Sequence, residues 1–285
     1  FLSAIGMMLS AGGGSVVSRR LGARRSKDAD RAFSTIAYAN VVIGIILACV
    51  GLFFLEDILL FLNVEPEQMQ YAREYQIITL LGLPFLLLSL TAQTFFTVAG
   101  YPKVGLVVAI CSGLTNVVFD IVLMGPIPWG MTGAAVATVL SWIVSVAAAL
   151  IFFARPNAPI RLLWVKPEWL AITGAVRSGF AEMVGNLSGS VTLFFFNAAF
   201  LHWLGIDGVA ALTVASYATY VFNCIFYGFC EATNPIISFK YGEQNWTQLH
   251  KVFTNSLKII GLVSLGAYAA CLVCAHPVLA VFAAP

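Results

Sequence analysis

Long runs of apolar residues alternate with short polar segments along this chain. An α-helix rises 1.5 Å per residue, so about 20 residues cross the hydrocarbon core of a bilayer. Runs of this kind occupy residues 1–18, 33–55, 72–98, 104–124, 133–154, 178–202, 208–237 and 254–282. The pattern therefore predicts an all-α polytopic membrane protein with about eight helices in this chain.

The composition supports this class. Hydrophobic residues make up 60% of the 285 residues, charged residues make up 10%, and the mean hydropathy is +0.91. In soluble domains about a quarter of residues are charged. The net charge of +2 is too small to indicate a nucleic-acid partner. We expect a monomer in a lipid bilayer, with no nucleic acid bound.

Neither the cysteines nor the histidines indicate catalysis. All six cysteines lie in apolar runs, where cysteine is usually a small buried hydrophobe. Cys271 and Cys274 form a CxxC pair without a second pair or a nearby His or Asp, so the sequence predicts no metal site there. His202, His250 and His276 lie near the ends of runs, and no Ser-His-Asp set or HExxH motif can be assembled. We expect no enzyme activity and no cofactor.

The basic residues are concentrated in alternate loops. Lys and Arg follow the first run, recur at Lys103 and in the segment after the fifth run, and recur again at Lys240 and Lys251. Basic loops of membrane proteins stay on the cytoplasmic side. We therefore expect a multi-pass protein of the plasma (cytoplasmic) membrane, and place on the cytoplasmic side the loops 19–32, 99–103, 155–177 and 238–253.

The chain contains an internal repeat with an offset of 220 residues. GSVVSRRLGARRSKDADRAFS (14–34) aligns without a gap with NPIISFKYGEQNWTQLHKVFT (234–254), so that Ser18 matches Ser238 and Gly22 matches Gly242. The repeat equates the first run with the seventh, six helices later and pointing the same way. It therefore predicts two parallel six-helix bundles, an architecture common among secondary transporters.

The repeat also divides the chain. We expect an amino-terminal lobe at 1–154 with five of its six helices, a cytoplasmic linker at 155–177, and a carboxy-terminal lobe at 178–285 with its first three helices. The chain begins and ends in apolar runs, so the remaining helices of a twelve-helix protein lie outside it.

Asp120 is an ionisable residue inside the apolar run CSGLTNVVFDIVLMG (111–125). A carboxylate at the bilayer centre costs on the order of 3 kcal/mol and normally faces protein or water. Asn116 shares its helical face, and Thr138 lies at a similar depth in the next run, beyond the small residues 133–137. Together they favour a protonatable site or an oxygen cage for a small hard cation. The alternative is an Asp120 side chain that snorkels to the nearby helix end.

Five motifs in order resemble one family: AGGGSVVSRRLGAR, LGLPF, TNVVFDIVLMG, WGMTGAAVAT and NPIISFKYGEQN. The chain resembles the multidrug and toxic compound extrusion (MATE) transporters from the second to about the ninth family helix, and is most similar to the bacterial branch of DinF-like and MepA-like proteins. The resemblance implies a bacterial antiporter that exports cationic or amphipathic organic compounds in exchange for Na⁺ or H⁺. It also implies that Asn116, Asp120 and Thr138 bind the coupling cation, together with an Asp on a first helix that this chain lacks.

Glu182, with Asn186 one turn away, is a candidate second acidic site because some family members bind a cation on the corresponding helix. The alternative is a solvated carboxylate near a helix N-terminus, where the helix dipole favours it. Glu231, beside Thr233 and Asn234, is interpreted as a helix-end residue.

Pro84 is expected to bend the third run. Gly12 to Gly14 are expected to allow close helix packing. The aromatic residues Phe194, Phe195, Phe196, Tyr217 and Tyr220 are expected to pack rather than bind substrate.

Three functions remain open from the sequence. The leading hypothesis is the cation-coupled antiporter. A flippase for a lipid-linked saccharide shares the broader superfamily and would need a basic groove, whereas the runs carry almost no internal Lys or Arg. A receptor or sensor has little reason to carry a six-helix duplication.

Overall fold

The computed structural model describes the backbone of residues 2–61, 66–126 and 129–282, and the side chains of these residues except 66–67, 206–207, 210, 214, 218 and 271–282. All regular secondary structure in this part of the chain is helical, as predicted. The helices are α1 (Leu2–Gly22), α2 (Ser26–Phe53), α3 (Leu55–Phe61), α4 (Pro66–Leu81), α5 (Leu83–Val98), α6 (Pro102–Met124), α7 (Gly130–Phe153), α8 (Trp169–Gly242) and α9 (Trp246–Phe282).

Five of the described helices are long and apolar enough to cross a membrane, or six if the bent pair α4–α5 counts as one span. They lie in α2, α6, α7, the first part of α8, and α9. Helix α1 and the second part of α8 do not meet this test, although the sequence pattern predicted both as spans. Most of α1 is buried and it is rich in Gly and Ser, because it packs against protein rather than lipid.

The third apolar run, 72–98, was predicted as one helix and is two. Segments Gln68–Leu81 and Leu83–Val98 meet at an angle of 54°. Pro84 lies in the first turn of α5, where its missing N–H costs nothing, and the backbone of α2 at Gly44 packs directly against it. The predicted bend at Pro84 is thus confirmed, and the prediction of an unbroken helix was wrong.

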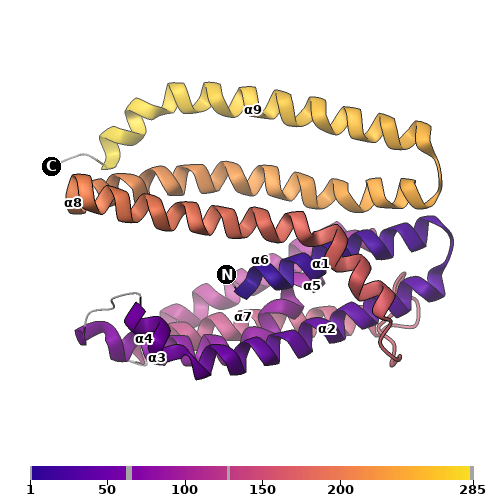
Figure 1. The fold of residues 1–285 in the computed structure, drawn as a ribbon, viewed down its shortest axis with the longest axis horizontal. Coiled ribbons are helices and arrows are strands. Elements are labelled where there is room, and N and C mark those ends of the chain that lie inside the picture. The colour runs from indigo at the N-terminus through magenta and orange to yellow at the C-terminus, as the bar shows by residue number, and fades with distance from the viewer. Residues whose placement is uncertain (1, 62–65, 127–128, 283–285) are drawn as a thin grey trace.

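Helix α8 is two helices joined at Gly205, whose φ of +68° is a conformation that favours glycine. The two parts run in opposite directions (Figure 1). The first part begins at Trp169, nine residues before the predicted start of the carboxy-terminal lobe. The predicted linker 155–177 is therefore irregular only as far as residue 168.

Hydrogen bonds hold the segment 155–168 against α2. The backbone N–H groups of Arg161 and Leu163 donate to Asp30 (2.9 Å) and Ser34 (2.8 Å), and that of Glu168 donates to Thr35 (3.2 Å). These side chains satisfy backbone donors that an extended segment would otherwise leave unpaired.

The end of this segment is held by a bidentate ion pair. Both terminal nitrogens of Arg20 donate to the Glu168 carboxylate, at 2.6 and 2.8 Å. The Arg20 guanidinium lowers the pKa of Glu168 below its ordinary value. The start of α8 is therefore anchored to the end of α1.

The core formed by α2, α5 and α7 is aromatic. The Phe33 ring lies 4.6 Å from that of Phe95 and 4.8 Å from that of Phe153, joining α2, α5 and α7. Phe95 is fully buried. Burial of this kind, together with dispersion between rings, stabilises this core.

A buried polar trio also involves α2 and α5. The Asn40 amide donates to Thr91 (2.8 Å) and Ser10 (3.4 Å), and the two hydroxyl groups lie 3.1 Å apart. The trio links α1, α2 and α5.

The two copies of the internal repeat end their helices in the same way. Arg24 and Gln244, 220 residues apart, both have positive φ, at 59° and 56°. The next residues, Arg25 and Asn245, each donate to the carbonyl five residues earlier, at 2.9 and 3.2 Å. This is the Schellman arrangement, which caps a helix with a left-handed residue.

Figure 1 shows how the two bundles lie. Helices α1 to α7 form the lower bundle, and most of α8 with α9 forms the upper one. The bundles meet at the end that carries the loops α1–α2 and α8–α9 and diverge toward the other end. We call the meeting end the basic end, because it holds Arg19, Arg20, Arg24 and Arg25.

Candidate functional site

The structure brings together two of the three residues predicted to bind a cation. The Nδ2 atom of Asn116 on α6 donates to the Thr138 hydroxyl on α7, at 3.4 Å. The Thr138 hydroxyl in turn donates to the Ala134 carbonyl, at 2.9 Å. The Asn116 amide oxygen and the Thr138 hydroxyl thus lie close together on this face of the helix pair.

Asp120 lies one turn after Asn116 and four residues before the end of α6. Its Oδ1 atom is buried and has no hydrogen-bond partner within the described structure. The Asn116 amide, on the same helical face, donates to Thr138 and not to this carboxylate. A buried carboxylate oxygen without a partner costs free energy unless a proton or a cation joins it.

Small residues on α7 let the two backbones approach, as predicted. Gly133, Ala135 and Ala137 are buried, and a β-carbon on Gly133 would lie 3.0 Å from the Leu123 carbonyl oxygen on α6. The Ser112 hydroxyl on α6 also donates to the Ser141 carbonyl on α7, at 2.7 Å. The helix pair that carries Asp120 is therefore held in close contact.

Glu182 and Asn186 also lie together. The Asn186 amide donates to a Glu182 carboxylate oxygen (3.3 Å) and to the Glu182 backbone carbonyl (2.9 Å). Glu182 follows Trp169 by thirteen residues, about 20 Å along the helix. Glu182 therefore does not lie at the N-terminus of its helix, because α8 begins nine residues before the apolar run 178–202.

Glu231 is the functional candidate that sequence reasoning missed. It is half-buried, and Thr94 on α5 donates to its Oε2 atom at 3.4 Å. Tyr227 lies one turn before it, close to both Glu231 and Glu182. The chain continues helically to Gly242, eleven residues beyond Glu231, so Glu231 is not at a helix end. No local spacing signals a contact with a residue 137 positions away.

The aromatic residues set aside as packing groups are all exposed in the described structure: Phe194, Phe195, Phe196, Tyr217 and Tyr220. The described histidines, His202 and His250, are also exposed. The side chains of Cys271, Cys274, His276 and Asp207 lie outside the described residues. Among the residues that were described, no three His, Cys, Asp or Glu side chains come together as a metal site.

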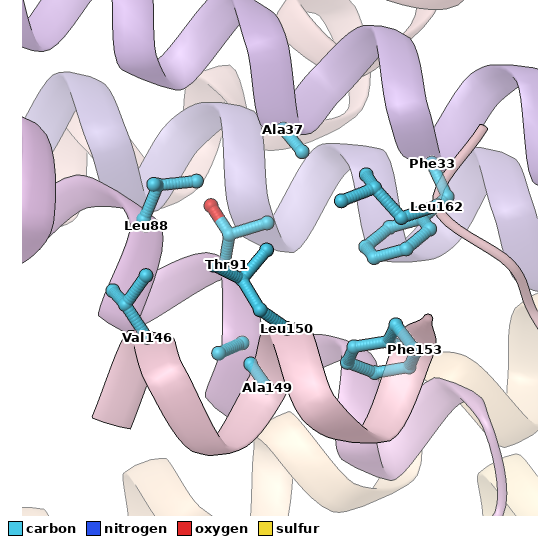
Figure 2. A pocket seen from close by; sticks show the side chains of 10 residues that line it. Phe33, Ala37, Leu88, Thr91, Val146, Ala149, Leu150, Phe153 and Leu162 are labelled. Carbon is cyan, nitrogen blue, oxygen red and sulfur yellow. The ribbon is translucent and has the colours of Figure 1, made fainter. Parts of the chain in front are cut away.

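A small cavity lies between α2, α5 and α7 (Figure 2). Its volume is about 40 Å³, and Thr91 is its only polar lining residue; the others include Phe33, Val146, Leu150 and Phe153. A water molecule takes about 30 Å³, whereas ligand pockets usually exceed about 300 Å³. This cavity is too small to hold a drug-sized molecule.

Comparison with known proteins agrees with this architecture. The family model described as MatE matches residues 1–122 and 183–285. The matched segments contain Asn116 and Asp120 on α6, the glycines of α1 and the repeated helix end at Gly242.

Curated relatives include the multidrug export protein MepA of Staphylococcus saprophyticus, which is 23% identical over 274 residues. The protein of the same name from Staphylococcus haemolyticus is 24% identical over 283 residues. The alignments cover 95% and 99% of this chain but only 59% and 62% of those proteins. The chain thus spans less than two thirds of the length of these relatives.

Solved structures share the fold. A MATE protein in the bent conformation superposes with a TM-score of 0.91 at 22% identity, over 99% of this chain and 64% of that one. An outward-facing multidrug resistance MATE transporter of the MOP superfamily gives 0.90 at 23% identity, with the same coverage. With the family model matched along most of its length and the repeat visible in its helix ends, the chain belongs to the MatE family.

Proposed function

We propose that this chain is part of a secondary active antiporter that exports cationic or amphipathic organic compounds in exchange for Na⁺ or H⁺. The observation that carries the proposal is the buried, unpartnered carboxylate oxygen of Asp120 beside the Asn116–Thr138 pair. The class of transported compound is proposed from the relatives that are named multidrug export proteins.

The proposed coupling step follows from the chemistry of this carboxylate. With a proton or Na⁺ bound, the site is neutral and the burial of Asp120 costs little. After the ion leaves, the charge favours a conformation in which water reaches the site. Oxygen atoms of Asn116 and Thr138 suit a small hard cation, and the same carboxylate also serves a proton.

Alternating access links this step to export. The two lobes would rock against each other, opening the space between them to one side of the membrane at a time. We assign the basic end to the cytoplasm, because basic loops are retained on the cytoplasmic side of the membrane. We further propose that the protein is a monomer in the plasma membrane of a bacterium.

The test is dye efflux from vesicles that contain the full-length natural protein, driven in turn by a Na⁺ gradient and by a pH gradient. We expect one gradient to drive efflux and Asp120→Asn to abolish that component. Asp57→Asn is the matched control, because Asp57 is an exposed carboxylate on the short helix α3.

Normal gradient-driven efflux by a well-folded Asp120→Asn protein would overturn the coupling role. If neither gradient moves dye in the wild-type protein, the antiporter proposal fails, and a labelled lipid-linked saccharide becomes the substrate to follow.

A further inference from the structure

Helix α1 crosses the second part of α8 with no side chain between the two backbones. A β-carbon on Gly22 would collide with the carbonyl oxygen of Phe239, and a β-carbon on Gly242 would collide with that of Arg19. Gly22 and Gly242 are 220 residues apart, as are Arg19 and Phe239. The contact is therefore reciprocal, and the axis that relates the two repeats passes through it.

A second crossing of the same kind lies further from the basic end. A β-carbon on Gly12 would collide with the Ala175 carbonyl, and one on Gly179 would collide with that of Met8. In the described structure, then, α1 touches both parts of α8 backbone to backbone. Any larger residue at Gly12, Gly22, Gly179 or Gly242 would push the lobes apart.

Two polar pairs also cross from one bundle to the other. The Thr94 hydroxyl on α5 donates to Glu231 (3.4 Å), and the Ser15 hydroxyl on α1 donates to Asn234 (3.1 Å). Both acceptors lie on one turn of α8, between the basic end and the break at Gly205. They are the side-chain hydrogen bonds that join α8 to the other bundle at this depth in the described structure.

Contacts of this type can separate without withdrawing a side chain from a neighbouring helix. Interlocked side chains must be withdrawn from the holes that they fill, whereas two glycine surfaces lose mainly weak Cα–H···O contacts and dispersion. A polar pair between helices in a membrane is worth only about 0.6 kcal/mol on average. The glycine crossing is close-fitting when shut, and opening it withdraws no interlocked side chain.

We propose that the Gly22–Gly242 crossing is the cytoplasmic gate of this protein and that the Thr94–Glu231 pair is its latch. The proposal rests on the proposed function in one respect, because it assumes that the two lobes move. It assigns to Glu231 a positioning role between the lobes, separate from the cation site at Asp120.

The anchored segment before α8 fixes where the gate can open. The Arg20–Glu168 ion pair and the Ser34 and Thr35 contacts hold the start of α8 against the amino-terminal lobe. Opening at Gly22–Gly242 therefore moves the second part of α8 with α9, while Trp169 and its neighbours stay with α1 and α2.

The gate is tested by measuring a distance, not by transport. Spin labels are placed at the exposed positions Ala23→Cys, in the loop after α1, and Gln248→Cys, in the first turn of α9, in the full-length protein with its native cysteines replaced. Double electron–electron resonance then reports the separation of the labels. We expect a major short-distance population in the parent protein.

Gly22→Val and Gly242→Val should each convert this population to a longer distance, and to similar extents because the contact is reciprocal. Gly261→Val is the matched control, because a β-carbon there meets open space on α9. An unchanged short distance in folded Gly22→Val protein would overturn the gate.

The latch is tested without added bulk, in case the valine variants do not fold. Thr94→Val should raise the ratio of long to short distances by about threefold, and Thr94→Ser, which keeps the hydroxyl, should restore it. Equal distributions for Thr94→Val and the parent would overturn the latch. Because the labels report separation whether or not dye is exported, a failed antiporter assay leaves these outcomes readable.

Discussion

Asp120 and Glu231, two carboxylates that lie inside helices, face different surroundings. Asp120 lies beside Asn116 and Thr138, on two helices adjacent in sequence and inside one lobe. Glu231 accepts a hydrogen bond from Thr94, on a helix of the other lobe. A site inside one lobe keeps its geometry when the lobes move, whereas a pair between lobes must break.

This difference separates two roles that an acidic residue can have in a transporter. A carboxylate that carries the coupling ion must keep its ligands through the cycle and exchange only the ion. A carboxylate that holds a gate needs one weak partner across the moving surface. The buried, unpartnered oxygen of Asp120 fits the first role, and the single long hydrogen bond of Glu231 fits the second.

The largest expected difference is in ion-driven export. Asp120→Asn should lower the initial rate of gradient-driven dye efflux by about tenfold or more, because it removes the exchangeable charge. Glu231→Gln keeps a hydrogen-bond acceptor for Thr94 and should change that rate by less than about threefold. The measurement is efflux from vesicles at matched protein content.

Equal losses in the two variants would remove the distinction between coupling site and latch. Equal melting temperatures of the variants and the wild-type protein are the control for intact folding.

A smaller effect is expected where α8 is anchored to the amino-terminal lobe. Arg20→Gln removes the bidentate pair with Glu168, whose side chain is about one third exposed. Solvent screening reduces the value of such a pair, so we expect a loss of about 1.5 kcal/mol in the free energy of unfolding.

The pH dependence gives this ion pair a signature. Arg20 lowers the pKa of Glu168, so its contribution is present above pH 4.5 and is lost as the pH falls through the folded-state pKa. In thermal melting from pH 7 to well below pH 4.5, the difference between Arg20→Gln and wild type should therefore narrow toward the acid end. A constant difference across this range would show that Arg20 acts through packing alone.

Much of the fold could be predicted from the apolar runs and the repeat, because both depend on residues close in sequence. The Asn116–Thr138 contact could be predicted for the same reason, because α6 and α7 are adjacent in sequence and a short loop joins them. The match of Gly22 with Gly242 in the sequence also anticipated two equivalent helix ends.

The features of the fold and the site that the sequence did not predict depend on polarity or on long-range packing. Residues 169–177 lie outside the apolar run 178–202, yet they are helical and two of them, Ala171 and Ala175, are fully buried. The bond from Thr94 to Glu231 was out of reach, because no spacing rule relates helices from two different bundles. The predicted division into lobes and the cytoplasmic assignment of the basic loops remain predictions.

A still smaller effect is expected at the partner of Asn116. Thr138→Val removes the hydroxyl that accepts from the Asn116 amide, and we expect the apparent affinity for the coupling ion to fall about fivefold, equal to about 1 kcal/mol. Thr138→Ser keeps the hydroxyl and should stay within about twofold of wild type. The measurement is the concentration of the driving ion at half-maximal efflux, and a Thr138→Ser protein as impaired as Thr138→Val would mean that side-chain volume, not the hydroxyl, matters.

The smallest expected effect concerns the second polar pair between the lobes. The Ser15 hydroxyl has one proton and two acceptors within reach, Asn234 at 3.1 Å and the Ala11 carbonyl of its own helix at 3.3 Å. Because the hydroxyl can turn to Ala11 when the lobes part, Ser15→Ala should shift the label distances by less than Thr94→Val does, about twofold. Ser190→Ala is the control, since that hydroxyl donates only within α8. A shift for Ser15→Ala larger than that for Thr94→Val would move the latch from Glu231 to Asn234, while the role of Asp120 inside its own lobe would stay as it is.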